Sequence, residues 1–164
     1  MTNQKLGLIC GVSLASLCSV IHAEELPKSG IISIYTGWKV VSEPINVADK
    51  IMQGHGSVVG VSFNDAGSGP LHGGPAICFF TFFARDGGDV SKGYCAFGDV
   101  DGDRIFTDWD GSNDGTVNQG INRIVGGTGK YKGISGSGPW KISDTGSLTA
   151  GASHTRQQFN YKLP

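Results

Sequence analysis

Short runs of apolar and β-branched residues, each closed by Gly, Asp or Asn, recur along the chain from about residue 30 to its end. The closing residues supply the positive-φ and side-chain-capped positions that tight chain reversals need. No stretch in this part has helical periodicity with caps, and the 27 glycines make long helices unfavourable. We therefore expect eight β-strands, at Ile31–Val41, Ile51–Phe63, Ala76–Arg85, Ser91–Phe97, Arg104–Trp109, Val117–Val125, Lys132–Ile142 and His154–Leu163.

Eight short strands in a chain of this length predict an all-β fold, a small antiparallel barrel of about eight strands. Such a barrel has an interior just wide enough to be filled by side chains or to hold one small ligand. Closure also removes exposed strand edges, on which other chains pair. Neither an internal repeat nor a linker interrupts the pattern, so residues 24–164 are expected to form a single domain.

The last predicted strand alternates two sets of side chains. The simplest interpretation directs one set to water and the other to the core. A shift of register would instead turn Arg156 and Asn160 inward, where they would anchor the carboxylate or carbonyl of a guest. The outward set is His154, Arg156, Gln158, Asn160 and Lys162, and the inward set is Thr155, Gln157, Phe159, Tyr161 and Leu163.

The segment from Ile77 to Ala84, ICFFTFFA, is apolar on both of its alternating faces. Its inner face is expected to meet the core, and its outer face to be covered by another layer or another subunit. The segment is therefore the first candidate for the interface of a homo-oligomer. A tail or loop folded over it is the alternative.

The first 23 residues have the features of a cleavable secretory signal. Lys5 precedes an uncharged apolar run from Leu6 to about Val20, and Ala23 ends the segment before an acidic pair. The run is shorter than the roughly 20 residues that a membrane-spanning helix needs. A lipid anchor on Cys18 is the less favoured alternative. We expect a signal peptide at 1–23 and an extracytoplasmic protein, periplasmic or secreted, with no membrane insertion after its removal.

The charge of the mature chain argues against polyanionic partners. Removing the signal takes away Lys5 and leaves 12 basic and 14 acidic side chains, with no run rich in Lys or Arg. Sequence-independent binding of nucleic acid needs a basic surface that displaces counterions. Neither nucleic acid nor an anionic membrane surface is therefore an expected partner.

Two cysteines, Cys78 and Cys95, remain after the signal is removed. Each lies in a predicted strand, and the two strands are consecutive, so a disulfide between neighbouring strands is geometrically reasonable. Disulfides persist in extracytoplasmic compartments. Two buried thiols, or one catalytic cysteine, are the alternatives.

Residues 125–133 read VGGTGKYKG and predict a tight reversal, because Gly126, Gly127 and Gly129 allow backbone conformations closed to other residues. This turn follows a strand with Cys95 and an acidic Asp101-Gly102-Asp103 turn. The ordered set resembles the allene oxide cyclase and dirigent barrel superfamily, including exported bacterial proteins of that group. The resemblance implies a calycin-like, eight-stranded barrel, often oligomeric, with a mostly apolar cavity. Its plant members cyclise an unstable fatty-acid epoxide or steer radical coupling, but none of their catalytic residues is carried over to this chain.

Asp99, Asp101 and Asp103 stand at alternate positions and form a weak candidate for a calcium site, since Ca²⁺ prefers oxygen ligands. Arg104 occupies the position where the twelve-residue calcium loop needs Gly, and no helices are expected beside it. A solvated hairpin turn with Asp-Gly at its tip explains the same residues. We therefore expect neither a metal nor another cofactor.

The leading hypothesis is a barrel that binds a small, largely apolar molecule in its cavity. A cyclase or isomerase that uses an inward polar residue is one alternative, and a structural barrel without a ligand is another, so enzymatic activity is left open. Ligand cavities are mostly apolar with a few placed polar groups. The residues expected to line this cavity are Trp38, Phe80, Phe82, Trp109, Arg123, Tyr131, Trp140 and Asn160.

Overall fold

The computed structural model of the chain describes residues 26–142 and 151–164. The predicted signal peptide and its cleavage site lie outside the described residues. In the part described, no helix is long and apolar enough to cross a membrane.

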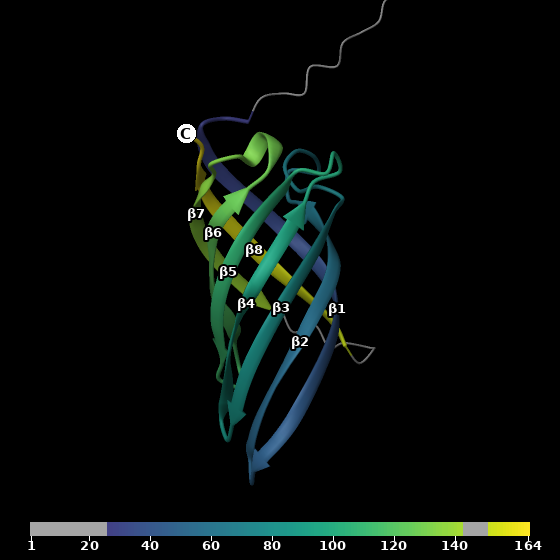
Figure 1. Cartoon of the computed structure of the whole chain (residues 1–164), viewed down its shortest axis with the longest axis vertical. Coiled ribbons are helices and arrows are strands. Elements are labelled where there is room, and N and C mark those ends of the chain that lie inside the picture. The colour runs from purple at the N-terminus through teal and green to yellow at the C-terminus, as the bar shows by residue number, and fades with distance from the viewer. Residues whose placement is uncertain (1–25, 143–150) are drawn as a thin grey trace, which may run out of the picture.

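Eight antiparallel strands form a closed barrel in which each strand pairs with its neighbours along the chain and β8 pairs with β1 (Figure 1). The predicted all-β barrel of eight strands is therefore confirmed. A single turn of 3₁₀-helix, η1 (Gly129–Tyr131), follows β6. The strands are β1 (Ser29–Ala48), β2 (Ile51–Asn64), β3 (Gly74–Arg85), β4 (Gly88–Gly98), β5 (Arg104–Asn113), β6 (Asn118–Gly127), β7 (Ser135–Ile142) and β8 (Ala152–Lys162).

Most strand boundaries differ from the sequence-based expectation by one to four residues, and the end of β1 differs by seven. The first strand runs on to Ala48 instead of ending at Val41, because it stays paired with β2 along a long hairpin. The seventh begins at Ser135 instead of Lys132, because the chain first makes the η1 turn, in which the Ile134 N–H donates to the carbonyl of Tyr131 (3.0 Å).

Side chains alternate between the barrel interior and the surface, and the last strand keeps the expected register. Phe159 and Tyr161 are buried, whereas Arg156 and Asn160 are exposed. The alternative register, with these two polar side chains inward, is therefore wrong.

The two ends of the barrel are built differently. One end carries η1, the C-terminus and the β2–β3 and β4–β5 connections, and the other carries the tight hairpins between β1 and β2 and between β3 and β4 (Figure 1). The first end, called here the closed end, is filled by a packed core. Its largest fully buried apolar side chains are Tyr131, Phe97, Phe159, Ile34, Leu71 and Ile105.

The outer face of β3 is exposed. Phe79 is 62% exposed, and its register partner on β4, Tyr94, is 69% exposed. Ile77 and Phe83 are partly exposed on the same face. The described residues therefore supply no covering tail or loop, and a covering subunit stays a prediction.

The predicted disulfide between Cys78 and Cys95 is confirmed. The two residues are directly opposed in the β3–β4 register, with Cα atoms 4.0 Å apart, and both side chains are buried inside the barrel. The bond therefore ties two neighbouring strands together at their inner faces.

Reduction of this bond should lower the free energy of unfolding by about 3 kcal/mol, because the unfolded chain regains the freedom of the closed loop. Urea unfolding with and without a reductant measures the difference. A Cys78→Ala/Cys95→Ala double variant is the control and should unfold identically in both conditions. An unchanged midpoint for the wild-type protein after verified reduction would contradict the prediction.

Candidate functional site

A cavity of about 320 Å³ occupies the half of the barrel next to the hairpins, which we call the open end. Its size is at the lower end of the range of small-molecule sites. Five aromatic side chains dominate its wall, and smaller residues such as Val40, Val58 and Ala84 complete it. The aromatic residues are Trp38 of β1, Phe80 and Phe82 of β3, Trp109 of β5 and Trp140 of β7.

The cavity reaches the surface at this end. A wider hollow of about 1140 Å³ shares Phe82, Ser91 and Trp140 with it. The wider hollow is also lined by outward-facing side chains such as His55 and Lys92, so it is the mouth of the cavity and the adjoining surface.

Inward-facing glycines make room for the aromatic wall. A Cβ on Gly54 would lie 2.7 Å from Phe82 Cζ, and a Cβ on Gly56 would lie 2.6 Å from Phe80 Cζ. Real Cβ atoms do not approach other atoms so closely, so each aromatic ring lies over the bare backbone of the neighbouring strand. The same relation holds between Gly120 and Trp140, and the Trp140 ring also reaches Gly111, which is paired with Gly120 on the next strand. The wall therefore depends on glycine opposite aromatic residues across paired strands.

A layer of hydrogen-bonded polar side chains spans the barrel below the cavity. Asn122 Nδ2 donates to Gln157 Oε1 (2.7 Å), and Gln157 Nε2 donates to Thr36 Oγ1 (3.3 Å). At its two ends, Thr107 Oγ1 donates to Asn122 Oδ1 (3.2 Å), and Thr36 shares a hydrogen bond with Ser62 (2.9 Å). All five residues are buried, and the layer separates the apolar core of the closed end from the cavity.

The side chains of Asn122 and Gln157 also line the cavity, so its floor is polar while its walls are apolar. Gln157 lies in the set of residues expected to face inward, but neither residue was expected at the site. The available signal was the alternation of each strand, which places Asn122 on the same face as the buried Ile124.

Three buried polar atoms of the lining have no hydrogen-bond partner among the described residues: Trp109 Nε1, Trp140 Nε1 and Asn118 Oδ1. The two indoles meet edge to face, with ring centroids 5.4 Å apart. In contrast, Trp38 Nε1 donates to Thr155 Oγ1 (3.0 Å). A buried donor without an acceptor costs about 1–3 kcal/mol, so the cavity has unmet hydrogen-bonding capacity.

The described lining of the cavity contains one ionisable side chain, Asp89. Its Oδ2 accepts a hydrogen bond from Asn113 Nδ2 (3.1 Å) near the mouth. Lys, Arg and His are absent from that lining, so the described wall offers no cationic partner for an anion.

Three of the residues expected in the cavity lie elsewhere. Arg123 points outward from β6 because of the strand alternation, and it forms ion pairs with Asp108 and Asp110 on β5. Asn160 is exposed on β8. Tyr131 is fully buried, but it lies in η1 at the closed end. The other five, Trp38, Phe80, Phe82, Trp109 and Trp140, line the cavity together.

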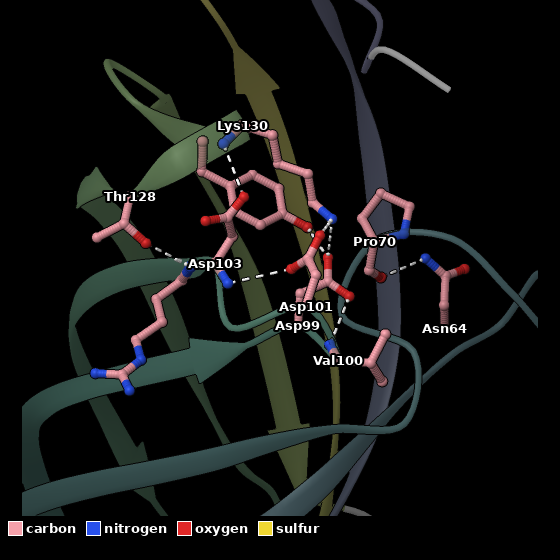
Figure 2. Close-up of polar contacts among 10 residues, drawn as sticks. Asn64, Pro70, Asp99, Val100, Asp101, Asp103, Thr128 and Lys130 are labelled. Carbon is pink, nitrogen blue, oxygen red and sulfur yellow. Dashed lines mark hydrogen bonds and ion pairs between the residues drawn. The ribbon is translucent and has the colours of Figure 1, made fainter. Parts of the chain in front are cut away.

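The acidic turn joins β4 to β5 and contacts the glycine turn at the closed end (Figure 2). The Tyr131 hydroxyl donates to Asp99 Oδ2 (2.6 Å), and Lys130 Nζ lies 2.9 Å from the same oxygen and 2.6 Å from Asp101 Oδ2. The Lys130 backbone N–H donates to Asp103 Oδ2 (2.9 Å). The three carboxylates are thus held by protein donors.

Among the described residues, no group of three or more His, Cys, Asp or Glu side chains is arranged to hold a metal ion. The candidate calcium ligands Asp99, Asp101 and Asp103 instead join two turns of the chain. The connection is a hairpin turn with Gly102 at its tip in the left-handed region (φ +94°), but Asp99 is buried, so the turn is not solvated throughout as the sequence predicted.

The glycine turn places Tyr131 under the end of the barrel. Gly126 and Gly127 end β6, and Gly129 begins η1 with φ +50°. A Cβ on Gly127 would lie 2.6 Å from Tyr131 Cβ, so only glycine allows the chain to fold back this tightly. The glycine turn therefore closes the barrel and does not line the cavity, whereas Cys95, which also carries the family resemblance, lies in the cavity wall.

Burial raises the pKa of Asp99, but the hydrogen bonds from Tyr131 and Lys130 outweigh it, and the net pKa lies below the usual value of 3.8. For Tyr131, burial and the hydrogen bond to Asp99 both raise the pKa of the phenol. The pair therefore consists of a neutral donor and a charged acceptor.

No family model matches this chain, and no curated protein sequence matches it. Among solved structures, the barrel is similar to the crystal structure of a protein of unknown function of the DUF3224 family from Shewanella oneidensis. The TM-score is 0.52 at 14% sequence identity, and the match covers 81% of this chain and 99% of that one. Similarity at this identity concerns the fold alone. Fold and site together define a small closed antiparallel barrel with a plugged end and an aromatic cavity at the other end.

Acid should weaken the contact between the two turns. Because the folded pKa of Asp99 is lowered, its contribution to stability is present above about pH 4 and is lost as the pH falls below this value. We expect urea unfolding between about pH 6 and pH 2.5 to show a smaller acid-induced loss for Asp99→Asn than for the wild-type protein.

Tyr131→Phe is the matched variant, since it keeps the buried ring and removes the hydroxyl. It should cost about 1–3 kcal/mol at neutral pH, because it removes a donor from a buried carboxylate. If the free energy of unfolding falls equally with acid in the wild-type protein, Asp99→Asn and Tyr131→Phe, other carboxylates control acid stability.

Proposed function

We propose that this protein is an exported small β-barrel that binds a small, largely apolar molecule in its interior cavity. The observation that carries the proposal is the aromatic cavity of about 320 Å³ above a polar floor. A barrel that acts only as a structural module gains stability from filling its interior, and this one leaves space between its largest side chains. Binding is the function that such a space supports.

Export is part of the proposal and is supported by the features of residues 1–23. The disulfide between Cys78 and Cys95 is compatible with an oxidising compartment outside the cytoplasm. The signal supports an extracytoplasmic location in general, either the periplasm or the extracellular medium.

Membership of the allene oxide cyclase and dirigent superfamily also belongs to the proposal. Eight-strand closure and the η1 turn at VGGTGKY support it. The fold alone does not imply a reaction, because one barrel architecture hosts many activities.

Binding is favoured over acid–base catalysis by the composition of the described lining. General acid–base catalysis uses positioned titratable groups, and that lining offers Asp89 alone. The polar residues that the sequence predicted in the cavity, Arg123 and Asn160, do not line it.

The first test is native mass spectrometry of the mature protein purified from its exported compartment. A guest mass that disappears on denaturation would support the proposal, and the same spectrum reports the cleavage site and the subunit number. A bare protein that also takes up no guest from lipophilic extracts would favour the structural barrel.

A second test fills the cavity. Val58 lines it, whereas its neighbour Val59 points outward and is 48% exposed. Val58→Phe should weaken binding of a lipophilic guest by tenfold or more, because the added ring occupies the space of the guest. Val59→Phe adds the same atoms outside and should leave binding unchanged. Quenching of tryptophan fluorescence measures both affinities, and equal effects would contradict an interior site.

A further inference from the structure

The cavity can be assigned a ligand class from its unpartnered donors and from its charge. We infer that the ligand is an uncharged, largely apolar molecule that carries a hydrogen-bond acceptor, such as a carbonyl or ether oxygen, held by the indole N–H groups of Trp109 and Trp140. This inference rests on the proposed function, because it names the chemistry that the same cavity recognises.

The two indoles are built as donors to the cavity. Trp140 is only 7% exposed, and its Nε1 and that of Trp109 are buried without a partner in the described chain. Trp109 Nε1 lies beside Gly93, where a Cβ would come within 2.9 Å of it. The glycine therefore allows this edge of the Trp109 ring to lie over the bare backbone of β4.

The donors lie together on one side of the barrel. Trp109 belongs to β5 and Trp140 to β7, and β6 between them brings Asn118, whose Oδ1 also lacks a partner. In the strand order, β2 with Val58 lies opposite β6. A guest that directs its polar atom to the β5–β7 side thus places its apolar part against Val58 and the phenyl rings of β3.

Charge in the described lining disfavours an anionic guest. Burying a carboxylate without a cationic partner is costly, and the only ionisable group of that lining is the carboxylate of Asp89. A fatty-acid carboxylate would therefore gain no ion pair there. A neutral carbonyl accepts the indole N–H groups without this cost.

The test uses three probes of one shape: 2-acetylnaphthalene, which carries a neutral acceptor, 2-isopropylnaphthalene, which carries none, and 2-naphthoate, which is an anion. Each is titrated into the full mature protein by isothermal calorimetry. The readout is the affinity ratio of the ketone to the hydrocarbon, compared between wild-type and variant proteins, so that differences in hydrophobicity cancel.

Trp109→Phe and Trp140→Phe remove the donors and keep an aromatic ring. Combined in one protein, the two substitutions should lower the affinity ratio of the ketone to the hydrocarbon by about tenfold. This is the scale of one hydrogen bond to a neutral acceptor. Trp38→Phe is the matched control, since the Trp38 indole already donates to Thr155 and also lines the cavity. It should leave the ratio unchanged.

The outcomes separate the two proposals. Binding of the ketone and the hydrocarbon with a ratio that neither Trp109→Phe nor Trp140→Phe alters would overturn the donor assignment while leaving the binding function intact. Naphthoate that binds as tightly as the ketone would overturn the assignment of an uncharged ligand. Absence of binding for all three probes, together with no retained guest, would overturn the proposed function itself.

Discussion

The interior of an eight-strand barrel is narrow, and the pairing of glycine with aromatic residues determines how this one is used. In the wall of the cavity, large rings lie where the strand beside them carries no side chain, as Gly54 and Gly56 do for Phe82 and Phe80. The rings then lie over bare backbone and leave a space between them. Larger residues at these glycines would require the rings to move, and the cavity with them.

The polar layer divides the interior of the barrel into two parts. Below it, Phe97, Ile105 and Phe159 form a dry core beside the Asp99–Tyr131 contact, which joins the turns of the closed end. Above it, the cavity faces the open end. Because Gln157 and Asn122 satisfy each other and their neighbours, the layer adds few unmet polar groups to the interior. Stability and binding can therefore reside in different parts of one small barrel.

Much of the fold was predictable because its signals are local. Turn residues mark the strand ends, and alternation identifies the inward faces, as it did for Thr155 to Tyr161. The extension of β1 to Ala48 was not predictable, because exposed strand residues are retained there only by pairing with β2. The aromatic residues of the predicted strands correctly indicated most of the large side chains that line the cavity. Arg123 and Asn160 were misplaced because chemical suitability was considered before the face of the strand, and Tyr131 because a buried ring in a turn resembles a ring in a wall.

The disulfide has a consequence through its position in the wall of the cavity. Cys78 and Cys95 both contribute to the lining, so the bond is reached through the same space that a guest would occupy. A thiolate must approach a disulfide sulfur directly in order to exchange with it. If the cavity binds a guest as proposed, its occupancy would limit the access of a thiolate to the bond. In a reducing environment, the Cys78–Cys95 disulfide would then be reduced more slowly in a barrel that holds a guest than in an empty one.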